Sequence, residues 1–188
     1  MRTQCLFRVL IALALMGGTS ASAFTPTVEF TGDSTLHAFG GSATVGAVDW
    51  SPPSNDACRL AVVVDSTSMQ TGNSARDANM QRLLDVLNFP RIAGWVDAIP
   101  AAWRTDAMSD QPLETEIHLT IRDQERRVPA RLQPVATANG ERALDVAFTI
   151  SLQSFGLKPP SVIGLIRVRD EVKIHALLPL PAQGAPGP

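Results

Sequence analysis

The sequence has 188 residues, of which 18 are acidic and 16 are basic, so its formal net charge is −2. This slight acidic excess argues against nucleic acid and anionic membrane surfaces as partners, because both are normally bound by an excess of lysine and arginine. Hydrophobic residues make up 45% of the chain, which is enough for one globular domain with its own core.

The first 23 residues have the pattern of a secretory signal peptide. Arg2 and Arg8 provide a positive start, residues 9–16 form a short apolar run, and Ala21-Ser22-Ala23 is a small-residue cleavage site. The run is shorter than the about 20 apolar residues that cross a bilayer, and no later segment comes closer. We therefore predict cleavage near Ala23, no integral membrane segment afterwards, and a periplasmic or secreted location.

Cysteine and histidine are too few for an internal disulfide or a zinc site. Cleavage would remove Cys5 and leave Cys58 alone, which excludes a disulfide within one mature chain. We favour a buried Cys58 and leave open a thiol that bridges two chains, so a homodimer also stays open. His37, His118 and His175 are scattered and do not form a metal-binding pattern. No metal or other cofactor is predicted.

The mature chain continues with a strand and then a helix. Residues 60–64 are Leu-Ala-Val-Val-Val, whose β-branched content favours a strand. Residues 80–87 place apolar side chains at i, i+3, i+4 and i+7, which predicts one apolar stripe along a helix: Met80, Leu83, Leu84 and Leu87. The Asn-Ser pair at 73–74 can cap its start, Asp77 suits the positive end of its dipole, and Pro90 would stop it.

Alternating patterns dominate the second half of the chain. Residues 116–122, 144–152 and 172–176 alternate apolar with polar or small residues, as strands with one buried face do. A further strand is expected at 126–133, after a turn at 123–125. The pattern predicts a mainly β, mainly antiparallel protein in which one helix covers an edge or an open end of the sheet.

The remaining segments are expected to lie outside the regular structure. Residues 100–111 look like an exposed loop, and the Pro/Gly-rich residues 179–188 look like a disordered tail. No repeat or internal boundary is visible between them and the signal peptide. We therefore predict one domain at 24–178, between a signal peptide at 1–23 and the tail.

Five short motifs follow one another in the mature chain. Residues 34–41 are Ser-Thr-Leu-His-Ala-Phe-Gly-Gly, and residues 71–77 are Thr-Gly-Asn-Ser-Ala-Arg-Asp. Phe-Pro-Arg-Ile at 89–92, Leu-Thr-Ile at 119–121 and Phe-Gly-Leu at 155–157 come after them. In this order and behind a signal peptide, the motifs resemble the YceI-like family of secreted bacterial β-barrels, which hold long apolar lipids.

This resemblance covers about residues 27–178 and implies a fold and a ligand. The implied fold is an extended antiparallel β-barrel of lipocalin type, with about eight strands, one covering α-helix and an elongated apolar cavity. The implied partner is an isoprenoid or fatty-acyl lipid. The strand pattern alone would fit a barrel filled with side chains, or a sandwich, equally well.

Two features depart from the family pattern. Asp123 stands where the hairpin of the family commonly has glycine, so this turn is expected to differ in type. Tyrosine is absent from the chain, so a ligand head group cannot be held by tyrosine hydroxyls. The second departure affects ligand identity more than the fold.

If the cavity exists, its inward-facing apolar side chains would contact the ligand, although each could equally be ordinary core. These predicted ligand-binding residues are Leu36, Phe39, Leu60, Val62, Val64, Met80, Leu83, Leu84, Leu87, Ile117, Leu119, Phe148 and Ile150. His37 and Arg76 are the candidates for a polar head group or the cavity mouth. For His37 we favour a structural hydrogen bond inside the barrel wall. For Arg76 we favour an ion pair or bonds to backbone carbonyls.

The leading hypothesis is an exported, non-catalytic protein that sequesters or transports a polyisoprenoid or fatty-acyl lipid. One alternative is a structural or interaction barrel with a packed core that acts in an envelope stress response. A serine hydrolase is the weaker alternative, suggested by Gly32-Asp33-Ser34. That class needs an α/β sheet and an aspartate three residues before its histidine, and none of the three histidines has one. His118 and His175 alternate with apolar neighbours, which places both on the outer face.

Overall fold

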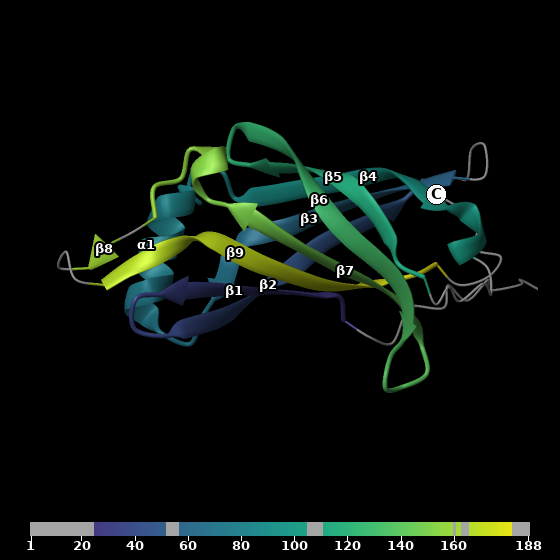
Figure 1. Cartoon of the computed structure of the whole chain (residues 1–188), viewed down its shortest axis with the longest axis horizontal. Coiled ribbons are helices and arrows are strands. Elements are labelled where there is room, and N and C mark those ends of the chain that lie inside the picture. The colour runs from purple at the N-terminus through teal and green to yellow at the C-terminus, as the bar shows by residue number, and fades with distance from the viewer. Residues whose placement is uncertain (1–24, 52–56, 105–110, 160, 163–165, 182–188) are drawn as a thin grey trace, which may run out of the picture.

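The computed structural model describes residues 25–51, 57–104, 111–159, 161–162 and 166–181 (Figure 1). The predicted signal peptide lies outside these residues. The strands within them are β1 (Thr27–Ser34), β2 (Ala38–Trp50), β3 (Ala57–Gln70), β4 (Arg91–Pro100), β5 (Leu113–Ile121), β6 (Gln124–Ala136), β7 (Arg142–Ser151), β8 (Ser161–Val162) and β9 (Ile166–Pro179). The helices within them are α1 (Ser74–Leu84) and the short 3₁₀ helices η1 (Ala101–Arg104) and η2 (Gln153–Phe155).

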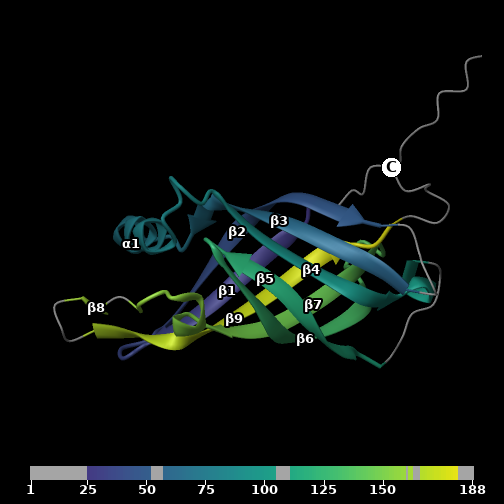
Figure 2. The same ribbon diagram turned by 90° about the horizontal axis from the view of Figure 1, so that it is seen from above.

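Eight of these strands form a closed antiparallel barrel. Strands β1 to β7 pair in chain order, β7 pairs with β9, and β9 pairs with β1 to close the ring. Strand β8 pairs only with the start of β9 and stands outside the ring (Figures 1 and 2). The predicted extended β-barrel with one α-helix is confirmed, and the sandwich left open by the strand pattern is excluded.

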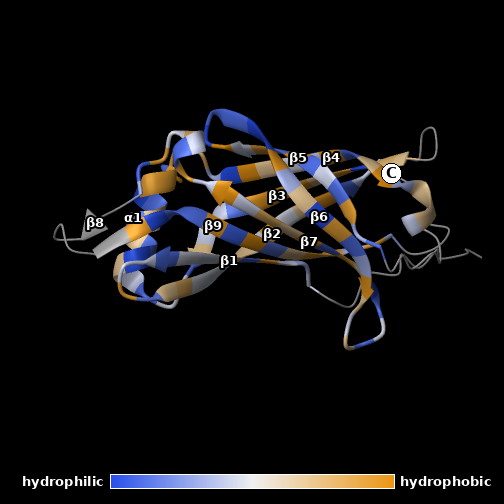
Figure 3. Ribbon diagram, viewed as in Figure 1, coloured by the Kyte–Doolittle hydropathy of each residue, from blue (hydrophilic) through white to orange (hydrophobic). Residues whose placement is uncertain are grey.

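Alternation along the strands separates the barrel interior from its outer surface. In β5, Ile117, Leu119 and Ile121 are buried, while the residues between them are more exposed. Figure 3 shows the same change between apolar and polar residues along most strands. Because successive side chains of a strand point to opposite faces, each strand contributes every second residue to the core. The predicted strands at 60–64, 116–122 and 126–133 lie largely within β3, β5 and β6.

The hairpin between β5 and β6 is tighter than the sequence suggests. Strand β6 already begins at Gln124, so the turn consists of Arg122 and Asp123 and not of residues 123–125. Arg122 has a φ of 57°, in the left-handed region that non-glycine residues enter rarely. The non-glycine turn therefore places a positive φ on the residue before Asp123.

The two ends of the barrel differ. Helix α1, strand β8 and the β1–β2 turn (residues 35–37) lie at one end, and η1 lies at the other (Figures 1 and 2). At the η1 end the side chains of Trp103, Ile99 and Leu144 are buried in the core. An Arg142 Nη2 donor bonds the Trp103 carbonyl at 2.7 Å and helps to hold η1 in place.

This arrangement corrects the exposed loop expected at 100–111. Residues 101–104 form η1, and Trp103 is only 5% exposed. One tryptophan in a polar segment creates no periodicity, so the sequence pattern gives no signal for its burial. Residues 105–110 lie outside the described part of the chain.

The C-terminal strand also continues past the predicted domain end. Strand β9 includes Pro179, and Leu180 is buried, with its N–H bonded to the Arg142 carbonyl at 3.4 Å. Residues 182–188 of the expected tail are outside the described residues. Cys58 is buried as favoured, with 1% of its surface exposed. None of the described helices is long and apolar enough to cross a membrane.

A candidate ligand cavity at the α1 end

Helix α1 begins where the sequence indicates and ends earlier. The Asn73 side chain accepts the Arg76 N–H at 3.0 Å and caps the start. The helix ends at Leu84, and Asp85 follows with a left-handed φ of 50°. The predicted stop at Pro90 is therefore wrong, because backbone geometry at Asp85 has already ended the helix.

The early end removes Leu87 from the predicted apolar stripe. Met80, Leu83 and Leu84 face the barrel from α1, whereas Leu87 lies in the following loop and is 94% exposed. The i+7 position shares the face of i only while the helix continues. Leu87 is thus not a cavity residue.

Short polar contacts hold α1 and the β1–β2 turn at the end of the barrel. The Asp77 carboxylate accepts the Thr71 N–H at 2.8 Å and the Thr71 hydroxyl at 2.6 Å, which ties α1 to the end of β3. The Ser34 hydroxyl donates to the His37 carbonyl at 2.8 Å and accepts the His37 N–H at 3.2 Å. These bonds fix the two segments that surround the opening.

A cavity of about 500 Å³ lies inside the barrel. This volume falls in the range of about 300–1,000 Å³ typical of small-molecule sites. Of the predicted ligand-binding residues, those that line it are Leu36, Phe39, Leu60, Val62, Val64, Met80, Leu83, Leu84, Ile117, Leu119, Phe148 and Ile150. The cavity contradicts a barrel filled with side chains along its whole length, whereas ligand contact by these residues remains a prediction.

Sequence reasoning missed the lining from the first and last strands. These residues include Val28, Phe30, Val168, Val172, Ile174 and Ala176, from β1 and β9. The alternation at 172–176 was the available signal, because it marks one inward face. Only the pairing of β9 with β1, which closes the barrel, shows that this face lines the same cavity as the predicted residues.

The mouth of the cavity can be located from the exposure of its lining. Four lining residues are exposed: Leu36, His37, Asn73 and Ala75. They come from the β1–β2 turn and from the start of α1, so the cavity opens between these two segments. His37 therefore belongs to the mouth, and the favoured structural hydrogen bond inside the barrel wall is wrong for its side chain.

Arg76 is the one lining residue with a permanent charge among the residues that the structure describes. Its guanidinium lies over the Phe39 ring, 4.7 Å from the ring centre. This group makes no hydrogen bond or ion pair to another described residue, so the favoured ion pair or carbonyl contact is not what the described chain shows. The Arg76 guanidinium is held by packing on the Phe39 ring, and its N–H donors are not used by other described residues.

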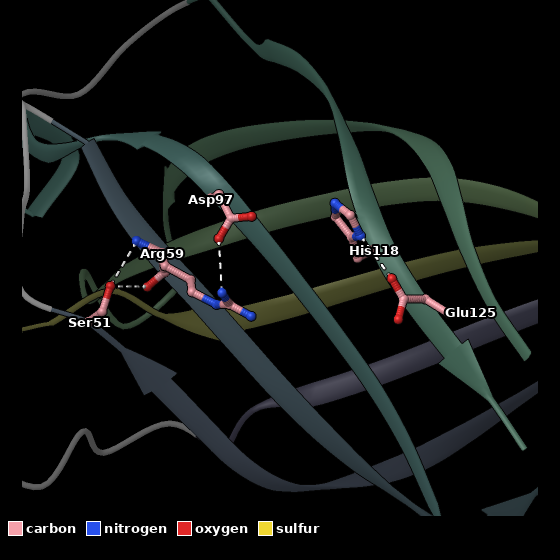
Figure 4. Close-up of polar contacts among 5 residues, drawn as sticks. All are labelled: Ser51, Arg59, Asp97, His118 and Glu125. Carbon is pink, nitrogen blue, oxygen red and sulfur yellow. Dashed lines mark hydrogen bonds and ion pairs between the residues drawn. The ribbon is translucent and has the colours of Figure 1, made fainter. Parts of the chain in front are cut away.

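The other two histidines lie on the outer face, as their strand phase predicts. The His118 Nδ1 is 3.1 Å from the Glu125 carboxylate (Figure 4), and its ring stacks on Trp95. The His175 Nε2 is 3.0 Å from the Asp145 carboxylate. The described residues contain no group of three histidine, cysteine or acidic side chains that could hold a metal ion. Neither histidine reaches the cavity.

Comparison with known proteins places this geometry in a family. A family model described as the YceI-like domain matches residues 19–179. The chain belongs to the YceI-like family. None of the curated proteins compared with it matches the sequence.

Several solved structures are similar to this chain, and two of them illustrate the shared fold. One is a polyisoprenoid binding domain from Saccharophagus degradans implicated in plant cell wall breakdown, with 15% identity, a TM-score of 0.60, and coverage of 81% of this chain and 91% of that chain. The other is Burkholderia cenocepacia BcnA, with 15% identity, a TM-score of 0.61, and coverage of 81% of this chain and 94% of that chain. At this identity the likeness shows the fold alone.

Proposed function

We propose that this protein binds a long apolar lipid, a polyisoprenoid or a fatty-acyl chain, inside its barrel and sequesters or transports it after export. The observation that carries the proposal is the cavity, which is lined mainly by apolar side chains and opens at the α1 end. The family and the likeness to a polyisoprenoid binding domain support the same ligand class. Export rests on the signal-peptide pattern of residues 1–23.

Burial of the apolar chain can supply most of the binding free energy at such a site, so few polar contacts are needed. Each CH₂ group removed from water contributes about 0.8 kcal/mol, so about ten buried groups contribute roughly 8 kcal/mol. Before the cost of immobilising the ligand, this corresponds to a Kd of about 1 μM. An apolar cavity of this size can therefore bind a lipid without a readable polar motif.

The lining favours binding over catalysis. Ser34 is the lining residue that the hydrolase hypothesis would use, and its hydroxyl donates to a backbone carbonyl within its own turn. Activation of a serine requires a base within hydrogen-bond reach of that hydroxyl. The contacts of Ser34 are those of a residue that shapes the β1–β2 turn.

A pair of adjacent substitutions tests the binding proposal. Val62 lines the cavity, whereas its neighbour Val63 does not and belongs to the opposite face of β3. Val62→Trp should fill part of the cavity and weaken binding of a radiolabelled fatty acid at least about tenfold, because the chain loses the space for several CH₂ groups. Val63→Trp, with the same change in size, should bind nearly as well as wild type.

Circular dichroism and thermal melting would confirm that both variants remain folded. Equal lipid binding by folded Val62→Trp and Val63→Trp would show that the interior is not the lipid site.

A further inference from the structure

We infer that the lipid carries an anionic head group, a carboxylate or a phosphate, and that Arg76 binds this group at the cavity mouth. This inference rests on the proposed function and adds the chemical class of the head. Its starting point is the distribution of polarity along the cavity. The hydrogen-bonding side chains Ser34, His37, Asn73, Arg76 and Asn79 all line the α1 end.

The charge balance of the mouth favours an anion. Arg76 is the only permanently charged lining residue in the described chain, and neither Asp33 nor Asp77 lines the cavity. The Asp77 carboxylate is already bonded to the Thr71 hydroxyl and N–H. Arg76 therefore lies at the mouth with no carboxylate of the described lining residues beside it.

The position of the Arg76 side chain suits recognition by hydrogen bonds. The guanidinium lies over the Phe39 ring at 4.7 Å, which holds the group while its N–H donors remain unpaired among the described residues. A guanidinium matches carboxylate and phosphate oxygens with two parallel hydrogen bonds.

His37 extends the same site. Its N–H and carbonyl are used within the β1–β2 turn, while its exposed ring lines the mouth and makes no hydrogen bond, ion pair or ring contact with another described residue. An imidazole can donate a hydrogen bond to a carboxylate or phosphate oxygen. The exposed mouth leaves such a head group near water while the chain is buried.

The test uses four ligands with the same apolar chain: dodecanoate, dodecyl phosphate, dodecanol and dodecylamine. Wild type should bind the two anions at least about tenfold more tightly than dodecanol, since hydrogen bonds to charged groups are worth this much. Dodecylamine should bind more weakly than dodecanol. The comparison of carboxylate with phosphate identifies which anion the mouth prefers.

Two variants assign the preference to Arg76. In Arg76→Gln the anions should bind within about threefold of dodecanol, and circular dichroism would confirm that the variant is folded. Arg91→Gln removes an exposed positive charge from the start of β4, outside the cavity lining, and should keep the full anion preference. The wild-type preference should also fall as salt rises.

The outcomes separate this inference from the proposed function. Equal binding of all four ligands by wild type, or an unchanged anion preference in Arg76→Gln, would overturn the anionic head group at Arg76 and leave lipid binding intact. No binding of any ligand by wild type would overturn the proposed function itself.

Discussion

At the scale of single residues, Asp65 holds an irregular step in β3. The pairing with β2 jumps here, from Thr44 opposite Asp65 to Ser42 opposite Gln70. The Asp65 carboxylate accepts the Thr67 hydroxyl at 2.6 Å and the Thr67 N–H at 2.9 Å. Mainly through the Thr67 hydroxyl, these hydrogen bonds hold the pKa of the Asp65 carboxyl below its ordinary value of 3.8.

A lowered pKa makes this part of the stability depend on pH. The contribution is fully present above about pH 3.8, the unfolded value, and is lost as pH falls through the lower folded value. Asp65→Asn should therefore be less stable than wild type at pH 6, and the difference should shrink towards pH 3. Urea unfolding at both pH values would measure it, with Asp123→Asn in the exposed β5–β6 turn as control. A difference that does not change with pH would contradict this assignment.

At the scale of elements, α1 depends on its attachment to the barrel. Its start is capped by Asn73, and the Asp77–Thr71 bonds connect its first turn to the end of β3. A helix of 11 residues is marginal by itself in water, so these contacts and the packing of Met80 and Leu83 hold it over the mouth.

Removing the attachment should loosen the mouth before it unfolds the barrel. Asp77→Ala leaves the partly buried Thr71 N–H without its acceptor, and we expect a loss of about 1–3 kcal/mol in the free energy of unfolding. Hydrogen exchange should speed up most in α1, and bound lipid should dissociate faster. Asp97→Ala, which breaks the exposed ion pair with Arg59, should cost less than about 1 kcal/mol. Equal exchange in α1 of wild type and Asp77→Ala would contradict this role.

The elements show what local sequence could predict. The start of α1 follows from capping, the strand at 60–64 from its β-branched residues, and the inward faces of β5 and β7 from alternation, all of which are local properties. The end of α1 depends on the left-handed turn at Asp85, where a non-glycine residue gives no warning. The burial of Trp103 depends on η1 folding against strands distant in sequence. Contacts between segments distant in sequence produce no periodic pattern of apolar residues that could predict them.

At the scale of the whole molecule, the barrel is packed at one end and hollow at the other. Ile99, Trp103 and Leu144 fill the η1 end and do not line the cavity. Towards α1, the inward side chains of β1, β3 and β9 leave a space of about 500 Å³. Alternation indicates that these side chains point inward. It does not tell whether they fill the interior or leave a space between them. The cavity was therefore expected from the family resemblance, and only the closed structure shows it.

The same distinction applies to the candidate site. Twelve of the predicted apolar residues line the cavity. In a hollow barrel, a side chain that points inward also lines the cavity. The sequence already made Arg76 a candidate for the cavity mouth, but it could not show that the guanidinium packs on the ring of Phe39. Phe39 in β2 and Arg76 in α1 come together because β2 pairs with β3, and α1 follows the end of β3.

The most direct test of lipid binding is extraction of the purified protein with organic solvent, followed by mass spectrometry. We predict about one long-chain lipid per wild-type molecule, far less from Val62→Trp prepared in parallel, and a melting temperature of delipidated protein that rises when lipid is returned. A wild-type protein that yields no lipid, and whose melting temperature does not change with added lipid, would contradict the account and favour a structural or interaction barrel.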